Sequence, residues 1–166
     1  MAATERLAAA VRIHRVLDVG CGRGVAASLI CQLLGQGTLL GLDRSAVAVS
    51  AAYTRNADPV AAGRAAFRQL ALADVEPDAP GVFEKILAVD VNLFWTGPAT
   101  CELRILARLL APEGRLVLCF APPDPGRLDH LTQAGFGAFA TTRPFPRGSA
   151  LLAVVAQPPG SRQPAP

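Results

Sequence analysis

Short apolar runs alternate with amphipathic stretches along most of the chain. The apolar runs predict strands over Arg15–Val19, Thr38–Leu42, Ala66–Ala71, Glu84–Val89, Arg115–Phe120, Ala138–Arg143 and Ala150–Ala156. Apolar residues at helical spacing predict helices over Ala3–Ile13, Val25–Leu34, Ala46–Asn56, Cys101–Leu110 and Arg127–Ala134. Strand and helix therefore alternate until the last two strands, which are separated by a short turn.

Alternating strands and helices predict βαβ units and hence an α/β domain with a mostly parallel sheet. Helices are expected on both faces of that sheet. The short turn between the last two strands leaves no room for a crossover helix, so the last strand should be antiparallel. We expect one domain over residues 1–157. Residues 158–166 are rich in Pro, Gly, Ser and Gln, a composition typical of a disordered tail.

A glycine-rich turn joins the first predicted strand to the helix after it. Residues 16–24 read Val-Leu-Asp-Val-Gly-Cys-Gly-Arg-Gly. Glycines there let the backbone approach a ligand closely, and the helix N-terminus offers free N–H groups. The spacing is G-x-G-x-G, whereas a dinucleotide site has G-x-G-x-x-G. The carboxylate of Asp18 also suits a cationic ligand group better than a pyrophosphate. Both features disfavour a nicotinamide-dependent oxidoreductase.

On this stretch the chain resembles the class I S-adenosylmethionine-dependent methyltransferases, whose first motif is D/E-x-G-x-G-x-G. The resemblance covers roughly residues 10–157. It implies a Rossmann-like sheet with an antiparallel inserted strand, and S-adenosylmethionine as cofactor. It also implies that the methionine part of the cofactor packs on the turn formed by Gly20, Cys21, Gly22 and Gly24. Cys21 could offer its backbone N–H, and Asp18 would anchor the same end directly or through water.

A second acid follows the second predicted strand. Asp43 comes about 25 residues after Asp18, close to the spacing of a ribose-binding acid. The resemblance implies that its carboxylate accepts from both ribose hydroxyls, and Arg44 could flank the adenine. The structural alternative is that Asp43 caps the next helix, a role for which Ser45 competes.

The end of the third predicted strand departs from the family pattern, which often has an acid followed by an apolar residue. Here those positions are Ala71 and Leu72, and the nearest acid is Asp74. Two alternatives remain open. Asp74 could contact the adenine from a shifted loop, or Ala71 and Leu72 could contact it through backbone and van der Waals interactions.

The segment after the fourth predicted strand should face the methyl group and its acceptor. Val89 and Asp90 are expected to contact the cofactor, and Asp90 or Asn92 could orient a nucleophile as catalytic residues. Trp95 could stack on a substrate. Family members that methylate amide or base nitrogens often carry Asn/Asp-Pro-Pro-Tyr/Phe here, and this chain lacks the proline pair. That absence argues against DNA or amide nitrogen as the acceptor.

Composition narrows the function classes further. The chain has 166 residues, 51% of them hydrophobic, and a net charge of +3. No apolar run approaches the roughly 20 residues of a membrane-spanning helix. The arginines are scattered, which argues against nucleic-acid binding. The four cysteines form no C-x-x-C pair, so no metal site is indicated. His14 and His130 are expected to be structural, and a cytoplasmic location is expected.

The resulting hypothesis is methyl transfer from S-adenosylmethionine to a small-molecule acceptor. The alternative is an S-adenosylmethionine-binding protein without transfer activity, such as a regulatory or partner subunit. Only 14 residues precede the first predicted strand, so little chain is available to close over an acceptor. The pocket could therefore be open to a large acceptor or covered by a partner chain or a second copy in a homodimer. A truncated start is a third explanation.

Overall fold

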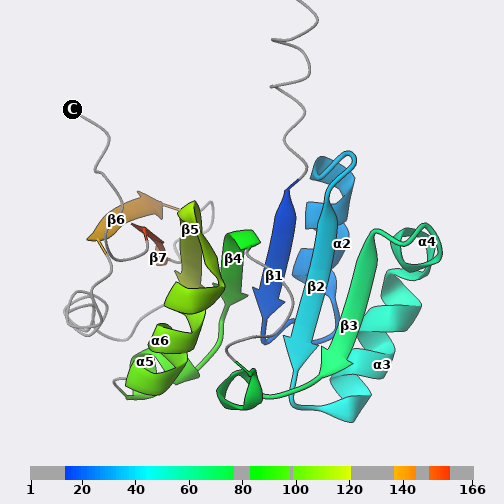
Figure 1. Cartoon of the computed structure of the whole chain (residues 1–166), viewed down its shortest axis with the longest axis horizontal. Coiled ribbons are helices and arrows are strands. Elements are labelled where there is room, and N and C mark those ends of the chain that lie inside the picture. The colour runs from blue at the N-terminus through cyan, green and yellow to red at the C-terminus, as the bar shows by residue number, and fades with distance from the viewer. Residues whose placement is uncertain (1–13, 77–82, 98, 121–136, 145–149, 158–166) are drawn as a thin grey trace, which may run out of the picture.

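The computed structural model describes residues 14–76, 83–97, 99–120, 137–144 and 150–157. Seven strands form one sheet in the order β3-β2-β1-β4-β5-β7-β6 (Figure 1). Their bounds are β1 Arg15–Val19, β2 Thr38–Asp43, β3 Ala65–Gln69, β4 Phe83–Val89, β5 Leu110–Phe120, β6 Gly137–Pro144 and β7 Ala150–Gln157. Strands β1 to β5 pair in parallel, which confirms the predicted parallel sheet. Strand β7 lies antiparallel to both β5 and β6, the direction that the short connection predicts.

Three longer helices match predicted ones closely: α2 Val25–Leu33, α3 Ala46–Arg55 and α6 Thr100–Leu109. Three short helical segments were not predicted: α4 Ala57–Ala61, the 3₁₀ segment η1 Leu72–Asp74, and α5 Leu93–Thr96. Segments of three to five residues are too short to show a helical period, so sequence periodicity could not reveal them. The predicted helices over 3–13 and 127–134 lie outside the described residues.

Strand β5 begins five residues earlier than predicted. The Pro-Glu-Gly sequence at 112–114 indicates a turn, yet Leu110 already pairs with Phe83 of β4. The register shifts between Phe83 and Lys85, and this irregularity absorbs the residues that the sequence assigns to a turn. Helix α6 therefore passes directly into β5.

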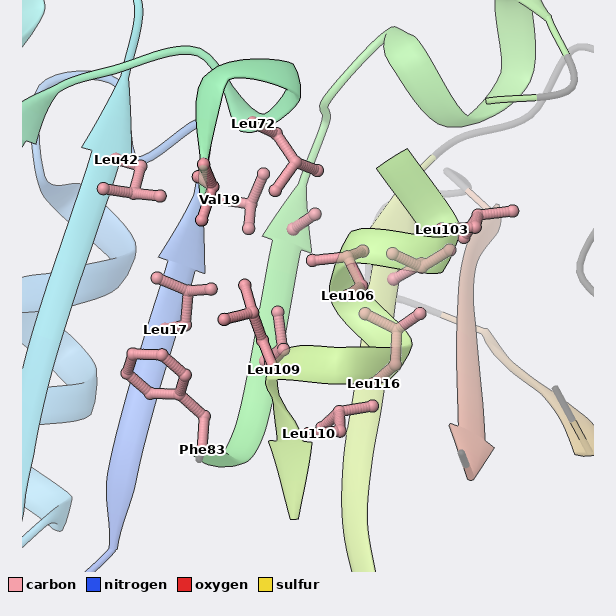
Figure 2. Close-up of a cluster of buried hydrophobic side chains, with 14 of the residues drawn as sticks. Leu17, Val19, Leu42, Leu72, Phe83, Leu103, Leu106, Leu109, Leu110 and Leu116 are labelled. Atoms are coloured by element: carbon pink, nitrogen blue, oxygen red, sulfur yellow. The ribbon is translucent and has the colours of Figure 1, made fainter. Parts of the chain in front are cut away.

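Helices pack on both faces of the sheet, as predicted. On one face, Leu103, Leu106 and Leu109 of α6 pack against strand residues that include Leu17 and Leu116 (Figure 2). The other face holds a second buried cluster, which joins the strands to α2 and α3. Its members are Val16, Cys21, Ala27, Cys31, Leu39, Val49, Ala52, Ala65 and Phe67. Neighbouring residues of β1 thus point to opposite clusters, as the two-residue repeat of a strand requires.

The strand order places a topological switch between β1 and β4. From β1 the chain continues through β2 to β3 on one side, and it then returns to build β4 and β5 on the other side. Open α/β sheets bind ligands outside the carboxyl ends of the strands at such a switch. A ligand site is therefore expected at the residues that follow β1, β2 and β4.

Candidate functional site

The glycine turn contains three left-handed glycines with different surroundings. A Cβ atom on Gly20 would lie 2.6 Å from Cγ2 of Val91, and one on Gly24 would lie 2.5 Å from Nδ2 of Asn56. Close packing thus requires glycine at both ends of the turn. Gly22 has φ +53°, and a Cβ added to it would meet no atom within 4 Å. The middle of the turn therefore faces open space, where a ligand can approach the backbone.

Asp43 ties the glycine turn to the end of β2. Its Oδ2 accepts a hydrogen bond from the Gly22 N–H at 2.9 Å, and its Oδ1 accepts one from the Ser45 N–H at 2.9 Å. The N-cap of α3 is Ser45, whose Oγ accepts from the Ala48 N–H at 3.3 Å. Each carboxylate oxygen has a second lone pair. Asp43 can therefore hold the turn and still accept hydrogen bonds from a ligand.

Asp18 is buried below the same turn with its side chain only 1% exposed. Its Oδ2 has no hydrogen-bond partner among the described residues. Burial and, second, the charge of Asp43 raise the pKa of the Asp18 carboxyl from 3.8 to about 7. A buried acceptor without a partner is unfavourable and indicates a place for a donor or a cationic group.

The backbone N–H of Cys21 makes a hydrogen bond within the protein. Its backbone N–H donates to the Leu42 carbonyl at 2.9 Å, so the turn uses this donor itself. Its side chain is buried, and burial, followed by the charges of Asp18 and Asp43, raises the pKa of the thiol to about 12. In this structure the Cys21 N–H therefore links the turn after β1 to the end of β2, and its contact with a ligand stays a prediction.

A cavity of about 580 Å³ opens at the carboxyl ends of β1, β2, β3 and β4. This volume lies within the usual range for small-molecule sites, roughly 300–1,000 Å³. Its lining residues are Val19, Gly20, Leu42, Asp43, Arg44, Leu70, Ala71, Leu72, Ala73, Asp90, Val91, Asn92, Leu93, Thr96 and Glu102. The segments that follow β1, β2, β3 and β4 therefore meet at one cavity.

Seven residues that the sequence singled out line this cavity: Gly20, Asp43, Arg44, Ala71, Leu72, Asp90 and Asn92. Six others are not part of its lining: Asp18, Cys21, Gly22, Gly24, Asp74 and Val89. After β3 the structure therefore brings Ala71 and Leu72 to the cavity. Asp74 instead lies exposed in η1, where its N–H donates to the Ala71 carbonyl at 3.0 Å.

Asp90 and Asn92 form the cavity wall after β4. Asp90 has φ +53°, a left-handed conformation that is uncommon outside glycine, and its N–H donates to the Cys119 carbonyl at 2.8 Å. The Asn92 carbonyl accepts from the Thr96 N–H at 3.0 Å and from Thr96 Oγ1 at 2.9 Å. Both residues are exposed at the wall of the cavity.

Sequence reasoning missed several lining residues, of which Glu102 is the most polar. It lies in the first turn of α6, where an acid is favoured by the helix dipole alone. Nothing in the local sequence distinguishes that role from a place at a cavity. Thr96 likewise lies in the short helix α5, which was not predicted. The side chain of Trp95 and residue His130 lie outside the described part of the chain.

Comparison with known proteins identifies the family. A family model described as a methyltransferase domain matches residues 16–114, more than half of the chain. The chain belongs to the class I S-adenosylmethionine-dependent methyltransferases. The matched range runs from β1 to the first part of β5 and includes both the glycine turn and Asp43.

Two curated relatives of this methyltransferase domain are longer proteins. It is 36% identical over 115 residues to an uncharacterised protein of Synechococcus sp., covering 69% of this chain and 27% of that protein. It is 27% identical over 135 residues to the ubiquinone biosynthesis O-methyltransferase of Xanthomonas euvesicatoria, covering 81% of this chain and 53% of that protein. The chain thus spans about half or less of the length of these relatives.

Solved structures share the fold. A TehB-like S-adenosylmethionine-dependent methyltransferase from Corynebacterium glutamicum superposes with a TM-score of 0.68 and 22% sequence identity, covering 92% of this chain and 85% of that one. At this level of identity the similarity establishes a common architecture. The chemistry of the domain has to be argued from its own site.

The site of the methyltransferase domain fits the family's cofactor. Gly22 leaves room over the turn, Asp18 offers a buried acceptor without a partner, and Asp43 lines the cavity. Across the described residues, no group of His, Cys, Asp or Glu side chains is arranged to hold a metal ion. No helix in the described ranges is long and apolar enough to cross a membrane.

Proposed function

We propose that this domain transfers a methyl group from S-adenosylmethionine to a small-molecule acceptor. The observation that carries the proposal is the meeting of the glycine turn, the Asp43 carboxylate and the post-β4 wall at one cavity of about 580 Å³. The turn supplies backbone without side chains, the carboxylate supplies an acceptor for hydroxyls, and the wall supplies polar side chains that can face an acceptor molecule.

The cofactor end of the cavity is assigned to residues after β1, β2 and β3. Asp43 accepts from the ribose hydroxyls through the lone pairs that its two structural hydrogen bonds leave free. Asp18, with its unpartnered Oδ2, attracts the positively charged end of the cofactor, directly or through water. Leu42, Leu70 and Leu72 offer apolar surface for the adenine. Asp74 has no part in this assignment.

The acceptor end is assigned to the wall formed by Asp90, Asn92, Thr96 and Glu102. When bound, S-adenosylmethionine supplies a methyl group already activated by the sulfonium charge. The protein therefore contributes chiefly by holding the nucleophile in line, and alignment alone can supply a large part of the rate enhancement. In this proposal Asp90 orients the acceptor, and its carboxylate can take a proton from a hydroxyl acceptor.

Thermal shift tests the choice of cofactor. We expect S-adenosylhomocysteine at about a hundredfold excess over its Kd to raise Tm by about 5–10 °C, because a ligand that binds only the native state stabilises it by mass action. NAD at the same concentration should leave Tm unchanged. The opposite ranking of the two ligands would refute the assignment of the cavity.

Transfer is tested separately, with S-adenosylmethionine labelled in its methyl group and a panel of small hydroxyl, amine and thiol compounds. Label appearing in an acceptor, and reduced in Asp90→Ala, would support the proposal. Binding of S-adenosylhomocysteine without transfer to any acceptor would favour the alternative of a regulatory or partner subunit. An added partner chain that restores transfer would favour a pocket completed by a second subunit.

A further inference from the structure

A second cavity, of about 420 Å³, lies in the layer of helices on one face of the sheet. It is lined by residues from α2, from the end of α3 and from α4, together with Arg64, which precedes β3. Figure 1 shows α4 beside the start of β3, whereas the cavity of the proposed active site lies at the carboxyl ends of the strands. The two cavities share none of their described lining residues, so the second one is separate from the proposed cofactor site.

Two arginine side chains line this second cavity and are held by backbone carbonyls. Nε of Arg55 donates to the Arg23 carbonyl at 3.1 Å. Nη1 of Arg64 donates to the Gly35 carbonyl at 2.8 Å and to the Cys31 carbonyl at 3.3 Å. A guanidinium group has five N–H donors, so each side chain is held in position and keeps N–H groups for a ligand.

The charge of the second cavity favours an anion. Asp58 is the acidic residue among its described lining residues, and it is exposed. Two guanidinium groups and one carboxylate give the lining a net charge of +1. The planar guanidinium group matches the oxygen atoms of phosphate and carboxylate groups. A small oxyanion is therefore the kind of ligand that this lining suits.

Asn56 also lines the second cavity, and one of its polar atoms lacks a partner. The residue is 1% exposed, and its Oδ1 accepts no hydrogen bond from the described residues. Its Nδ2 donates to the carbonyls of Gly24 and Ala52, and neither of these residues lines the cavity. Oδ1, on the other side of the amide group, is therefore turned away from both. A buried acceptor without a partner beside a cavity indicates a place for a ligand that donates a hydrogen bond.

We propose that the second cavity binds a phosphate group that carries an O–H donor. The guanidinium groups of Arg55 and Arg64 bind the phosphate oxygens, and the O–H group donates to Oδ1 of Asn56. The ligand is inorganic phosphate or a small phosphate ester with hydroxyl groups. This site does not depend on the proposed function.

An NMR titration of the full chain, in a buffer free of phosphate and at constant ionic strength, tests the site. At neutral pH inorganic phosphate carries at least one proton, whereas sulfate carries none. We expect phosphate to shift the backbone amide signals of residues 54–58 and 64 until they saturate. Sulfate should bind at least about tenfold more weakly, because it leaves Oδ1 of Asn56 without a donor.

Glycerol phosphate, titrated in the same way, distinguishes the two sources of the phosphate group. Tighter binding than that of inorganic phosphate would assign the site to an ester, and weaker binding would assign it to the free ion. Either result supports a phosphate site.

Arg55→Gln should weaken phosphate binding by at least about tenfold, because hydrogen bonds to a charged group are lost. Arg68→Gln is the matched control, since it removes the same charge from a residue of β3 that lines neither cavity. It should bind phosphate as tightly as the unaltered protein. Both residues are exposed, so both variants are expected to keep the fold, which circular dichroism checks.

Equal affinities for phosphate and sulfate would overturn the proposal. Equal weakening by Arg55→Gln and Arg68→Gln would overturn it as well, because it would indicate binding to net charge alone. The same holds for signal shifts confined to the glycine turn at 20–24, and for titrations that show no saturation up to about 10 mM phosphate.

Discussion

The carboxyl group of Asp18 is the least favourably placed polar group in the described site. It is buried, one of its oxygens has no partner among the described residues, and Asp43 adds a second negative charge nearby. The resulting pKa of about 7 means that the native protein holds a proton which the unfolded chain releases near pH 4. The free energy of unfolding should therefore fall as pH rises between about 4 and 7.

Asp18→Asn is expected to stabilise the free protein at alkaline pH, because it removes the cost of the buried charge. The advantage over the unaltered protein should grow by about 2 kcal/mol between pH 5 and pH 8. Urea unfolding at both pH values measures it. A difference in stability that is the same at pH 5 and pH 8 would show that Asp18 is ionised throughout this range.

The Asp43 carboxylate holds the glycine turn and the start of α3, and we propose that it also binds the cofactor. Asp43→Ala leaves the N–H groups of Gly22 and Ser45 without their acceptor, so the free energy of unfolding should fall by about 1–3 kcal/mol. The affinity for S-adenosylhomocysteine should fall by a similar free energy. Ser45→Ala is the matched control, since losing an N-cap costs about 1 kcal/mol but removes no ligand contact. Equal affinities of the two variants, measured by calorimetry, would limit Asp43 to a structural role.

At the scale of elements, Asn56 joins the beginning of α2 to the end of α3. The residue is 1% exposed, and its Nδ2 donates to the Gly24 carbonyl at 3.1 Å and to the Ala52 carbonyl at 2.9 Å. Nδ2 also occupies the space that a Cβ on Gly24 would need. The packing of α2 against α3 therefore requires glycine at position 24. The hydrogen bonds of Asn56 also hold the glycine turn in place.

Asn56→Asp tests this junction with almost no change in volume. An ionised carboxylate would face two carbonyl oxygens, so we expect a loss of about 3 kcal/mol or more in the free energy of unfolding at pH 8. The loss should be smaller at pH 5, where a protonated carboxyl can still donate one hydrogen bond. Denaturant unfolding at the two pH values checks both statements, and an equal loss at each pH would contradict them.

The elements that sequence reasoning identified are those with enough residues to show a period. Strand β1 was predicted with its observed bounds, and α2 and α3 each ended one residue earlier than predicted. The short segments α4, α5 and η1 were missed, and β5 began at Leu110 instead of Arg115 because pairing with Phe83 overrode the local turn signal. The start of β5 was predicted wrongly because it depends on pairing with a distant strand, which a short stretch of sequence does not reveal.

At the scale of the whole molecule, the strand order assembles the site from segments far apart in the chain. The glycine turn and Asp43 could be predicted because a single βαβ unit fixes their spacing. Glu102 and Thr96 could not, because only the packing of α5 and α6 beside β4 brings them to the cavity. The burial of Asp18 likewise depends on the strand order, which places it between Gly41 of β2 and Leu87 of β4.

The proposed cofactor site at the glycine turn is tested by the affinity of Gly22→Val for S-adenosylhomocysteine, compared with that of Gly63→Val. Both glycines have positive φ, +53° and +68°, and an added Cβ meets no atom within 4 Å at either position. Both variants should lose a similar free energy of unfolding, about 1–2 kcal/mol, from backbone strain. In the proposed function the cofactor packs on the glycine turn that contains Gly22, whereas Gly63 lies in the loop before β3.

Calorimetry measures the affinity of the folded fraction of each variant for S-adenosylhomocysteine. We expect that Gly22→Val abolishes detectable binding while Gly63→Val binds as tightly as the unaltered protein. A folded Gly22→Val protein that binds S-adenosylhomocysteine with unchanged affinity would show that the glycine turn is not the cofactor site.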